Sequence, residues 1–502
     1  MIHFNELLFG MIMKKYTVQV QYATDKPSLD LLLRNILKLD LFCGDTLVDF
    51  KRIKQLLDSL EDDISFVAEF PYTDSHYRDC YYFYYAAKFE KLSRETIRVH
   101  IFKNSIASID SLFEKAAENE GAVSELYYGF FIIRPLNRFP LGHSFISPLA
   151  FKVHDFFCCL VKERIYLNGI RLTVAAFPHI AQDTETHTCA ESSLWVLLAY
   201  YGARYSNHQV LLPSEIIRHL NPVSIHRMLP SSGLTVDELS AVLTQDGHNC
   251  VLYTKKTDKD LIQIMRIYIE SGIPFIVALE NDTSGHAVVA IGHKEEKPVA
   301  PTDGWKDMCE YDRRIVFIDD NMAPYQLADV QEPTAHYGGT LADMKIASLV
   351  VPLQKHMFLE AGQAYRLVKD ILNHADIGLN KFGGVWQTRL LLTSGRAFKN
   401  SLLKDALIAP NIRQAFIKIN LPKFIWICEI YKDNNFQAEL CNGIIILDST
   451  GGRCLSSAIL YVLEDKNFIT DGAKWKKFQL PVKFEKKTYK HNLKGAWNKW
   501  SI

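Results

Sequence analysis

Apolar and polar residues in the middle of the chain alternate with two different periods. Residues 170–176 have the two-residue period of a strand, and residues 189–201 and 258–271 have the spacing of helices. Between those helices, Thr235 and Glu238 have the spacing of a capping box, which opens a further helix. The pattern therefore predicts one strand followed by three helices.

Four apolar runs of strand length follow these helices, at residues 274–279, 286–291, 314–318 and 346–353. Helices that precede a sheet, instead of alternating with its strands, indicate an α+β fold. Residues 295–313 are charged and contain proline and glycine, so we interpret them as an insertion between two strands.

The two ends of the chain mix shorter helical and strand-like stretches. Before the centre, we expect strands at 16–21 and 127–133, helices at 28–39 and 51–60, and an aromatic core segment at 70–85. After it, we expect helices at 361–372 and 401–407, and paired strands at 424–430 and 443–447. The predicted domains are an N-terminal α/β domain over 1–168, a central domain over 169–355 and a C-terminal α/β domain over 356–502.

The composition narrows the class of protein without naming a partner. Of the 502 residues, 48% are hydrophobic and 23% are charged, which is typical of a globular chain and disfavours disorder. Basic and acidic residues number 57 each, so the net charge does not indicate a nucleic-acid or anionic-membrane partner. No apolar run approaches the ~18 residues of a membrane span, and the first residues lack the layout of a signal peptide. We therefore expect a cytoplasmic protein with no membrane contact.

The tail from Lys474 to Lys499 is an exception to the charge balance. It holds nine lysines against one acid, Glu485, with aromatic residues between them. Such a segment can bind nucleic acid, but a solvent-exposed edge strand protected by lysines is the favoured interpretation.

Three separated residues form a pattern typical of nucleophilic catalysis. Cys189 stands where a helix is expected to begin, and a helix N-terminus favours the thiolate. His286 opens a strand after a glycine and can act as the base, and Asp319 ends the next strand, where it can orient the imidazole. Asp320 is the alternative orienting carboxylate. The ten cysteines show no Cys-x2-Cys spacing, and His208, His219 and His226 show no compact ligand spacing, so we expect free thiols and no metal site.

These segments resemble the papain-like cysteine peptidases, most closely the bacteriocin-processing (double-glycine leader) peptidase domains, over about residues 175–355. The family has a cysteine-containing loop, a nucleophile helix ending in Tyr-Tyr-Gly, a Gly-Leu-Thr-x-x-Glu-Leu helix, a histidine at a strand start and a downstream aspartate. The corresponding residues here are Cys189, Tyr200-Tyr201-Gly202, Gly233-Leu234-Thr235 with Glu238-Leu239, His286 and Asp319. The resemblance implies a papain-like core, in which a nucleophile helix packs on an antiparallel sheet.

The chain departs from the family pattern at three positions. The family's oxyanion glutamine lies six residues before the cysteine, but Asp183 occupies that position and Gln182 lies one residue earlier. Either the loop is longer by one residue, with Gln182 in this role, or another group completes the oxyanion hole. Ala190 replaces a glycine, and Asp319-Asp320 replaces Asp-Pro, which favours Asp319 as the orienting residue.

The resemblance implies a cysteine-dependent amide-bond hydrolase, a peptidase or isopeptidase acting on a protein or peptide, with Cys189, His286, Asp319 and Gln182 as catalytic residues and no cofactor. A deamidase or acyltransferase can use the same thioester chemistry. A papain-like module kept only for binding is the non-enzymatic alternative. The chain contains no Gly-x4-Gly-Lys-Ser/Thr motif, which disfavours export-coupled processing by this chain alone.

Overall fold

The computed structural model describes residues 19–39, 48–103, 106, 108–224, 228–255, 260–294, 299–311, 313–470 and 475–497. Residues 16–18 of the first predicted strand and 258–259 of a predicted helix lie outside this set. Residues 295–298 and 312 of the predicted insertion also lie outside it, as do Cys43, His226, Lys474 and Lys499.

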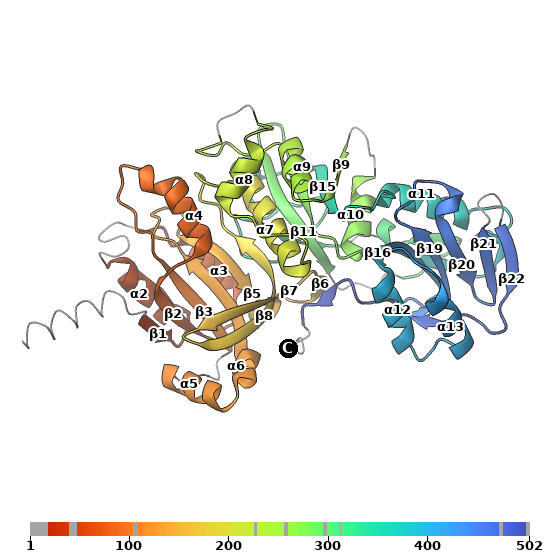
Figure 1. The fold of residues 1–502 in the computed structure, drawn as a ribbon, viewed down its shortest axis with the longest axis horizontal. Helices are drawn as coiled ribbons and strands as arrows, with labels where there is room; N and C mark the ends of the chain where they lie inside the picture. The colour runs from red at the N-terminus through yellow and green to blue at the C-terminus, as the bar shows by residue number, and fades with distance from the viewer. Residues whose placement is uncertain are drawn as a thin grey trace, which may run out of the picture.

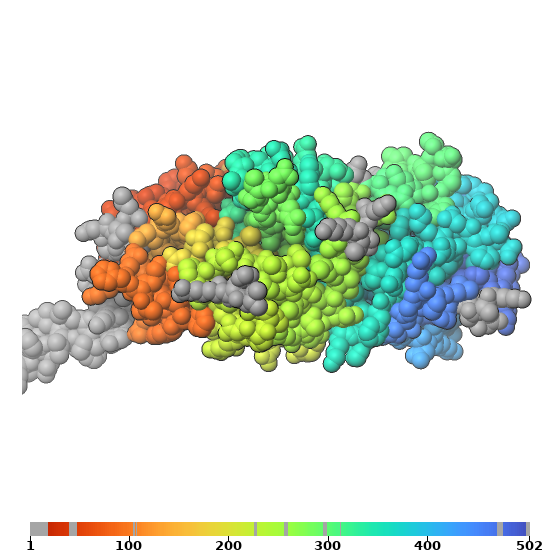
Figure 2. All heavy atoms as spheres, turned by 90° about the horizontal axis from the view of Figure 1, so that it is seen from above, coloured from red at the N-terminus to blue at the C-terminus, as the bar shows by residue number. Residues whose placement is uncertain are grey.

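Three sheets follow one another along the long axis of the molecule (Figure 1). We call the parts built on them the N-terminal, central and C-terminal units. The space-filling view shows the same order, with the central unit between the other two (Figure 2). The α+β class with antiparallel sheets is therefore confirmed, apart from one parallel pair of strands.

The N-terminal unit is built on an antiparallel sheet with strand order β1-β2-β3-β4-β5-β8-β7. Its strands are β1 (Gln19–Ala23), β2 (Ile64–Tyr72), β3 (Thr96–Lys103), β4 (Tyr127–Ile133), β5 (Leu141–Ile146), β7 (Val161–Leu167) and β8 (Ile170–Ile180). Its helices are α2 (Lys26–Leu37), α3 (Lys51–Ser59), α4 (Ser75–Phe83), α5 (Ile109–Glu118) and α6 (Glu120–Leu126). The aromatic segment at 70–85 is only partly core, because Tyr77 and Tyr85 are buried but Tyr82 and Phe83 are exposed.

The central unit holds a sheet with the path β14-β13-β11-β10-β15-β9, to which β6 and β24 are added. Its strands are β6 (Phe156–Cys158), β9 (Asn249–Thr254), β10 (Phe275–Glu280), β11 (Gly285–Lys294), β13 (Ile315–Ile318), β14 (Gln326–Ala328), β15 (Lys345–Leu353) and β24 (Lys494–Gly495). Its helices are α7 (Cys189–Arg204), α8 (Pro213–Leu220), α9 (Val236–Gln245) and α10 (Leu261–Glu270). The capping box predicted at Thr235 and Glu238 is confirmed.

The C-terminal unit is built on a sheet with strand order β12-β16-β17-β19-β20-β21-β22. Its strands are β12 (Trp305–Asp307), β16 (Trp386–Ser394), β17 (Phe424–Lys432), β19 (Gly443–Asp448), β20 (Ala458–Leu463), β21 (Lys466–Thr470) and β22 (Trp475–Gln479), with β18 (Leu440–Cys441) and β23 (Lys486–Lys487) forming a separate pair. Its helices are α11 (Ala361–Leu372), α12 (Gly395–Lys404) and α13 (Pro410–Lys418). The helix predicted at 401–407 instead begins at Gly395, because Ser394 caps it, and ends where Asp405 turns extended.

The sheets do not divide at the predicted boundary between residues 168 and 169. That boundary falls in the tight turn of the β7–β8 hairpin, where Asn168 and Gly169 both have positive φ angles, and β8 pairs with strands of the N-terminal unit. The predicted insertion supplies β12, which pairs with β16 of the C-terminal sheet. Backbone pairing therefore connects units that the sequence pattern separates.

Helix α7 forms the centre of the middle unit. Every residue from Ala190 to Tyr201 is buried, and the helix packs on β11 and β8. A helix buried on all sides must be apolar all round, which explains why its sequence shows only a weak polar face. The first residue, Cys189, is partly exposed, and the helix leaves the core again at Ala203 and Arg204.

A chain of buried charges joins the central and C-terminal units. Glu270, at the end of α10, accepts from Arg389 of β16 at 2.9 Å, and Arg389 also donates to Glu429 of β17 at 3.1 Å. Lys486 of the lysine-rich tail donates to Glu429, and both side chains are almost completely buried. The edge-strand interpretation of the tail fits β22, whose lysines are exposed, but Lys486 is an internal ion-pair partner.

We expect Lys486→Met to destabilise the protein by about 3 kcal/mol, because removal of one partner leaves a buried charge poorly compensated. Lys487→Met is the matched control, because the neighbouring side chain is exposed and its loss should change stability by less than about 0.5 kcal/mol. The midpoint of urea unfolding, followed by tryptophan fluorescence, measures both. Equal midpoints for the two variants would contradict the structural role of Lys486.

Candidate active site

The loop that leads into α7 is organised around the buried carboxylate of Asp183. Its Oδ1 accepts the backbone N–H groups of Glu185, Thr186 and His187 at 2.9, 2.8 and 3.1 Å. Its Oδ2 accepts from the Tyr85 hydroxyl of the N-terminal unit at 2.8 Å. Burial raises the pKa of Asp183, but His187 and Arg134 lower it more strongly, so the carboxylate stays ionised. This loop therefore has a fixed shape before the helix begins.

His187, which had no expected role, belongs to the same buried group. Its ring lies 3.3 Å from the Asp183 carboxylate and 3.3 Å from Nη1 of Arg134. Burial lowers the pKa of His187. We therefore assign His187 to the support of the loop.

The first turn of α7 is fixed by Glu191. This side chain accepts from the backbone N–H of Thr188 at 3.1 Å and from its hydroxyl at 2.6 Å. Ser231 also donates to Glu191, so the start of the helix is connected to the segment that precedes Gly233. Cys189 is thereby presented at a helix N-terminus, where the helix dipole and free N–H groups favour negative charge.

Cys189 and His286 line one cleft, and Asp319 hydrogen-bonds to His286. His286 lies at the start of β11, and its Nε2 is 3.0 Å from Oδ1 of Asp319, which follows β13. Burial lowers the pKa of His286, but the charge and hydrogen bond of Asp319 and the neighbouring Cys189 thiol together outweigh it, so the net pKa lies well above the ordinary value.

Asp319 is held by more than the histidine. Its Oδ1 also accepts the backbone N–H of Asn321 at 3.0 Å, and its Oδ2 accepts the Tyr337 hydroxyl at 2.7 Å. Burial raises the pKa of Asp319, but the charge of His286 and these donors lower it to about 2. Asp319 is therefore an ionised, fully oriented acceptor.

Asp320 is buried beside Asp319 but differs from it in its surroundings. Neither carboxylate oxygen of Asp320 has a hydrogen-bond partner among the residues that the structure describes. Burial raises the pKa of Asp320, the His286 charge opposes this and the Asp319 charge adds to it, for a value of about 7. Of the two aspartates left open by the sequence, the one hydrogen-bonded to His286 is thus Asp319.

Gln182 lies beside Asn321, two residues after Asp319. Its side-chain N–H donates to Oδ1 of Asn321 at 2.5 Å. Arg52, from α3 of the N-terminal unit, donates to the same Asn321 oxygen at 2.6 Å, to the Asp320 carbonyl at 3.2 Å and to the Gln182 carbonyl at 3.4 Å. Arg52 therefore fastens the two loops of the site to each other.

A cleft of about 710 Å³ opens in front of Cys189 and His286. Apolar side chains of Leu234, Leu239 and Leu279 line it, together with the backbone around Gly233. Gln182 is not among its lining residues. The reactive pair thus faces a space of the size that ligand sites usually have.

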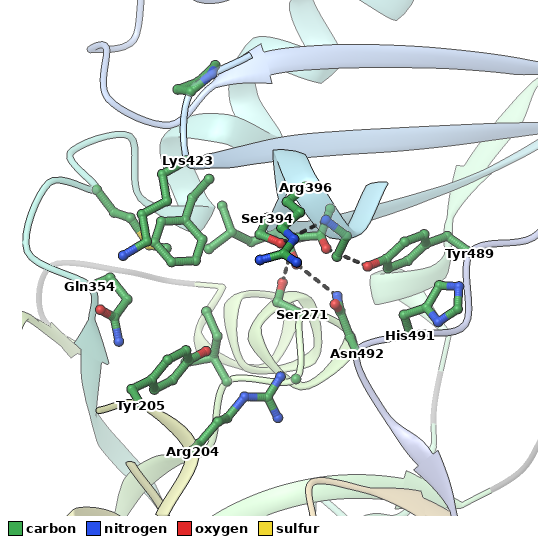
Figure 3. Close-up of a pocket in the computed structure, with 18 of the residues that line it drawn as sticks. Arg204, Tyr205, Ser271, Gln354, Ser394, Arg396, Lys423, Tyr489, His491 and Asn492 are labelled. Carbon is green, nitrogen blue, oxygen red and sulfur yellow. Dashed lines mark hydrogen bonds between the residues drawn. The ribbon is translucent and has the colours of Figure 1, made fainter. Parts of the chain in front are cut away.

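A second cavity, of about 590 Å³, lies elsewhere in the fold, between the central and C-terminal units (Figure 3). Arg204, Arg396 and Lys423 line it, and no carboxylate does among the residues that the structure describes. Ser271 and Asn492 lie at its wall and hydrogen-bond to the backbone of Leu392 in β16. This cavity does not include Cys189 or His286.

The sequence pattern identified Cys189, His286 and Asp319 as candidates, but not the residues that hold them in place. Cys189, His286 and Asp319 are brought together as expected, whereas Gln182 is held on Asn321. Arg52 and Tyr337 were missed, because each reaches the site only through the fold, although Arg52 lies in a predicted helix.

No protein-family model matches the chain, and no curated protein matches its sequence. Within the described ranges, the longest apolar helices are too short or too polar to cross a membrane. The chemistry of the site must therefore be inferred from its geometry.

The two aspartates give opposite predictions for stability against pH. The folded pKa of Asp320 is raised from 3.8 to about 7, so the unfolded chain releases this proton first and stability falls as pH rises through that interval. Asp320→Asn removes this loss, and we expect it to stabilise the protein by on the order of 3 kcal/mol at pH 8, and little at pH 4.

Asp319→Asn is the matched variant with the opposite sign. The folded pKa of Asp319 is lowered to about 2, so its contribution is present above pH 4 and disappears as pH falls towards 2. We expect Asp319→Asn to destabilise the protein by on the order of 2 kcal/mol at neutral pH. Urea unfolding at pH 4, 6 and 8 measures both variants, and a parallel shift of the two would contradict the assignment of charge.

Proposed function

We propose that the protein is a cysteine-dependent amide-bond hydrolase that acts on a peptide or protein substrate. The observation that carries this proposal is that Cys189, at the start of a buried helix, and His286 line one cleft, with Asp319 hydrogen-bonded to His286. A nucleophile, a base and an orienting carboxylate in mutual contact are the parts that thioester chemistry requires. The family resemblance over residues 175–355 supports the same assignment.

The first half of the reaction forms a thioester. His286 takes the thiol proton, and Sγ of Cys189 attacks the carbonyl carbon of the amide. The resulting imidazolium is stabilised by Asp319, whose charge already raises the pKa of His286. When the tetrahedral intermediate collapses, the C–N bond breaks and the leaving amine takes the proton from His286.

The second half restores the enzyme with water. His286 takes a proton from water as the oxygen attacks the thioester carbon. The C–S bond then breaks, Sγ of Cys189 regains its proton from His286, and the acid product leaves. The overall change is hydrolysis of one amide bond, and the residues require no external oxidant or reductant.

The negative oxygen of the intermediate needs donors near Cys189. The free backbone N–H groups at the start of α7 are such donors. Gln182 is the proposed side-chain donor: one of its N–H groups is used by Asn321, and its second has no partner within the described part of the chain. Arg52 and Asn321 keep this carboxamide in place.

The apolar lining of the cleft favours an extended substrate with an apolar side chain near the bond that is cleaved. Leu234, Leu239 and Leu279 form this lining next to Cys189. Glu238 and Glu280 lie at its edge, so a basic substrate residue further along is electrostatically favoured.

Thiol reactivity tests the proposal without knowledge of the substrate. The background is Cys454→Ser, because Cys454 is an exposed competing thiol. In this background, we expect iodoacetamide to alkylate Cys189 first, and His286→Ala to slow that reaction about tenfold or more at pH 7, because the thiolate loses its imidazolium partner. Mass spectrometry of tryptic peptides measures the rate.

The matched control is His356→Ala, which removes an exposed histidine away from the cleft and should leave the rate unchanged. Hydrolysis of a peptide library should vanish in Cys189→Ala and in His286→Ala, while far-UV circular dichroism stays the same. Hydrolysis that survives either substitution would refute the proposal. Release of ammonia from glutamine side chains without backbone cleavage would identify a deamidase instead.

Gln182→Ala tests the oxyanion assignment. Loss of one such donor lowers kcat by about 100- to 1000-fold with little change in KM. Gln182→Glu is the matched control, since it keeps the size of the side chain but removes its N–H donors, and it should lose as much. A fall of less than tenfold in kcat for both variants would restrict Gln182 to positioning Asn321.

A further inference from the structure

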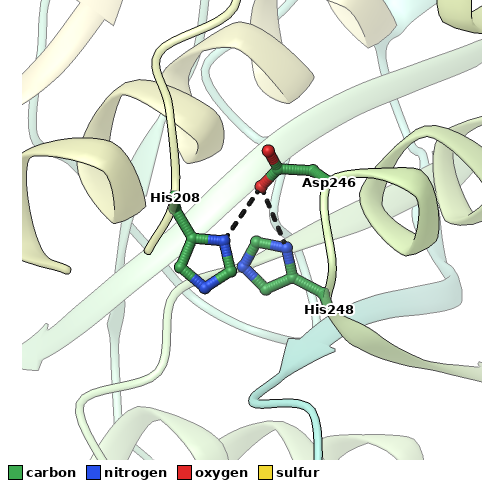
Figure 4. Close-up of side chains that lie close together, drawn as sticks. All are labelled: His208, Asp246 and His248. Atoms are coloured by element: carbon green, nitrogen blue, oxygen red, sulfur yellow. Dashed lines mark hydrogen bonds and ion pairs between the residues drawn. The ribbon is translucent and has the colours of Figure 1, made fainter. Parts of the chain in front are cut away.

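Three side chains of the kind that bind metal ions lie close together in the central unit. None of them has a role in the site described above. His208 follows α7, Asp246 ends α9, and His248 precedes β9 (Figure 4). His208 and His248 are buried, with 5% and 4% exposed, and Asp246 is half-buried, although only 8% of its side chain is exposed. The sequence spacing of the histidines did not predict this cluster, because Asp246 and His248 reach His208 only after the chain folds.

The turn at the end of α9 brings Asp246 and His248 close together. Asp246 is the C-cap of the helix, and Gly247 follows with a φ angle of +94°, which reverses the chain direction there. His248 therefore lies on the same side as Asp246, and its imidazole stacks on that of His208 with ring centroids 4.1 Å apart.

The distances between the ligand atoms fit a shared cation. Nδ1 of His208 and Nδ1 of His248 lie 3.1 and 3.3 Å from Oδ2 of Asp246, and all three ligand atoms lie within 4.8 Å of one another. Bonds of about 2.0–2.1 Å to a tetrahedral ion separate its ligands by roughly 3.4 Å. The cluster is therefore nearly at ligand spacing.

Hydrogen bonding alone leaves His248 unsatisfied. Although Nδ1 of His248 faces Asp246, it lacks hydrogen-bond geometry, and its Nε2 has no partner within the described residues. A buried polar group with no partner is destabilising. A bound cation at Nδ1 would provide the partner that His248 lacks.

We propose that His208, Asp246 and His248 bind one first-row divalent metal ion, with Zn²⁺ as the best fit. Two imidazoles and one carboxylate are a mixed nitrogen and oxygen set of the kind that Zn²⁺ accepts, with a water as the fourth ligand. The ion joins the loop after the nucleophile helix to the α9–β9 turn. It lies outside the Cys189–His286–Asp319 site and does not depend on the proposed hydrolase activity.

Gln354 and the second cavity lie next to the His208–Asp246–His248 cluster. The Gln354 amide nitrogen lies 3.4 Å from Nε2 of His208; with the amide turned over, its oxygen would accept the ring N–H once Nδ1 binds metal. Gln354 also lines the cavity of Figure 3, together with Tyr201 and Tyr205, whose rings lie near that of His208. The cavity therefore lies next to the residues that surround His208.

Zinc titration of the full chain tests this proposal. The background chain is Cys189→Ala/His286→Ala/Cys454→Ser, which removes the thiol and the histidine of the cleft and the exposed Cys454 thiol as competing ligands. After treatment with EDTA and dialysis, we expect calorimetry to show one Zn²⁺ bound per background chain. The further substitution His248→Ala should abolish the binding of this Zn²⁺ ion. The substitution Gln354→Ala should instead lower the Zn²⁺ affinity of the background chain about 10- to 100-fold.

The control is His356→Ala, an exposed histidine close to Gln354 in sequence, which should bind one equivalent as the background does. If His248→Ala fails to fold, Asp246→Asn and the visible spectrum of the Co²⁺-loaded background replace it, since tetrahedral Co²⁺ absorbs strongly. No stoichiometric binding by the background overturns the proposal. Equal binding by the background and His248→Ala, or by Asp246→Asn, overturns it as well.

Discussion

The buried carboxylate of Asp183 is the interaction on which the geometry of the reactive residues depends. A single oxygen of this side chain holds three consecutive backbone N–H groups of the loop before Cys189. A charge at this depth is tolerated only with strong partners, and His187, Arg134 and Tyr85 supply them. Two of these partners come from the N-terminal unit, so the loop shape depends on contacts outside the central sheet.

Two adjacent aspartates show how position, not residue type, sets the chemistry. Asp319 has a histidine, a tyrosine hydroxyl and a backbone donor around it, and its pKa falls to about 2. Asp320 has the same burial without those donors, and its pKa rises to about 7. A like charge next to Asp319 would compete for His286, so a protonated Asp320 leaves the imidazole to a single carboxylate.

The sequence alone predicts the local features of this fold better than its connections. Helix α7 and the capping box at Thr235 follow from spacing within short segments. The Cys–His–Asp order follows from the place of each residue at the start or end of such a segment. The sequence pattern placed a domain boundary after residue 168, inside the β7–β8 hairpin. It did so because β8 has the same alternating pattern whether it pairs with β5 and β7 or with the central sheet. Arg52 and the His208–Asp246–His248 cluster were missed for the same reason: their partners are distant in sequence.

The exchange of strands makes the central unit depend on both of its neighbours. Its sheet contains β6 from before the predicted boundary and β24 from the last described part of the chain, which pairs with β6 at Lys494 and Gly495. Glu270 and Arg389 connect α10 to the C-terminal sheet from within the core, while Arg52 holds the site from the other end. A segment cut at residues 169–355 would keep Cys189, His286 and Asp319 but lose an edge of their sheet and the clamp on their loops. The flanking units are therefore structural parts of the candidate site.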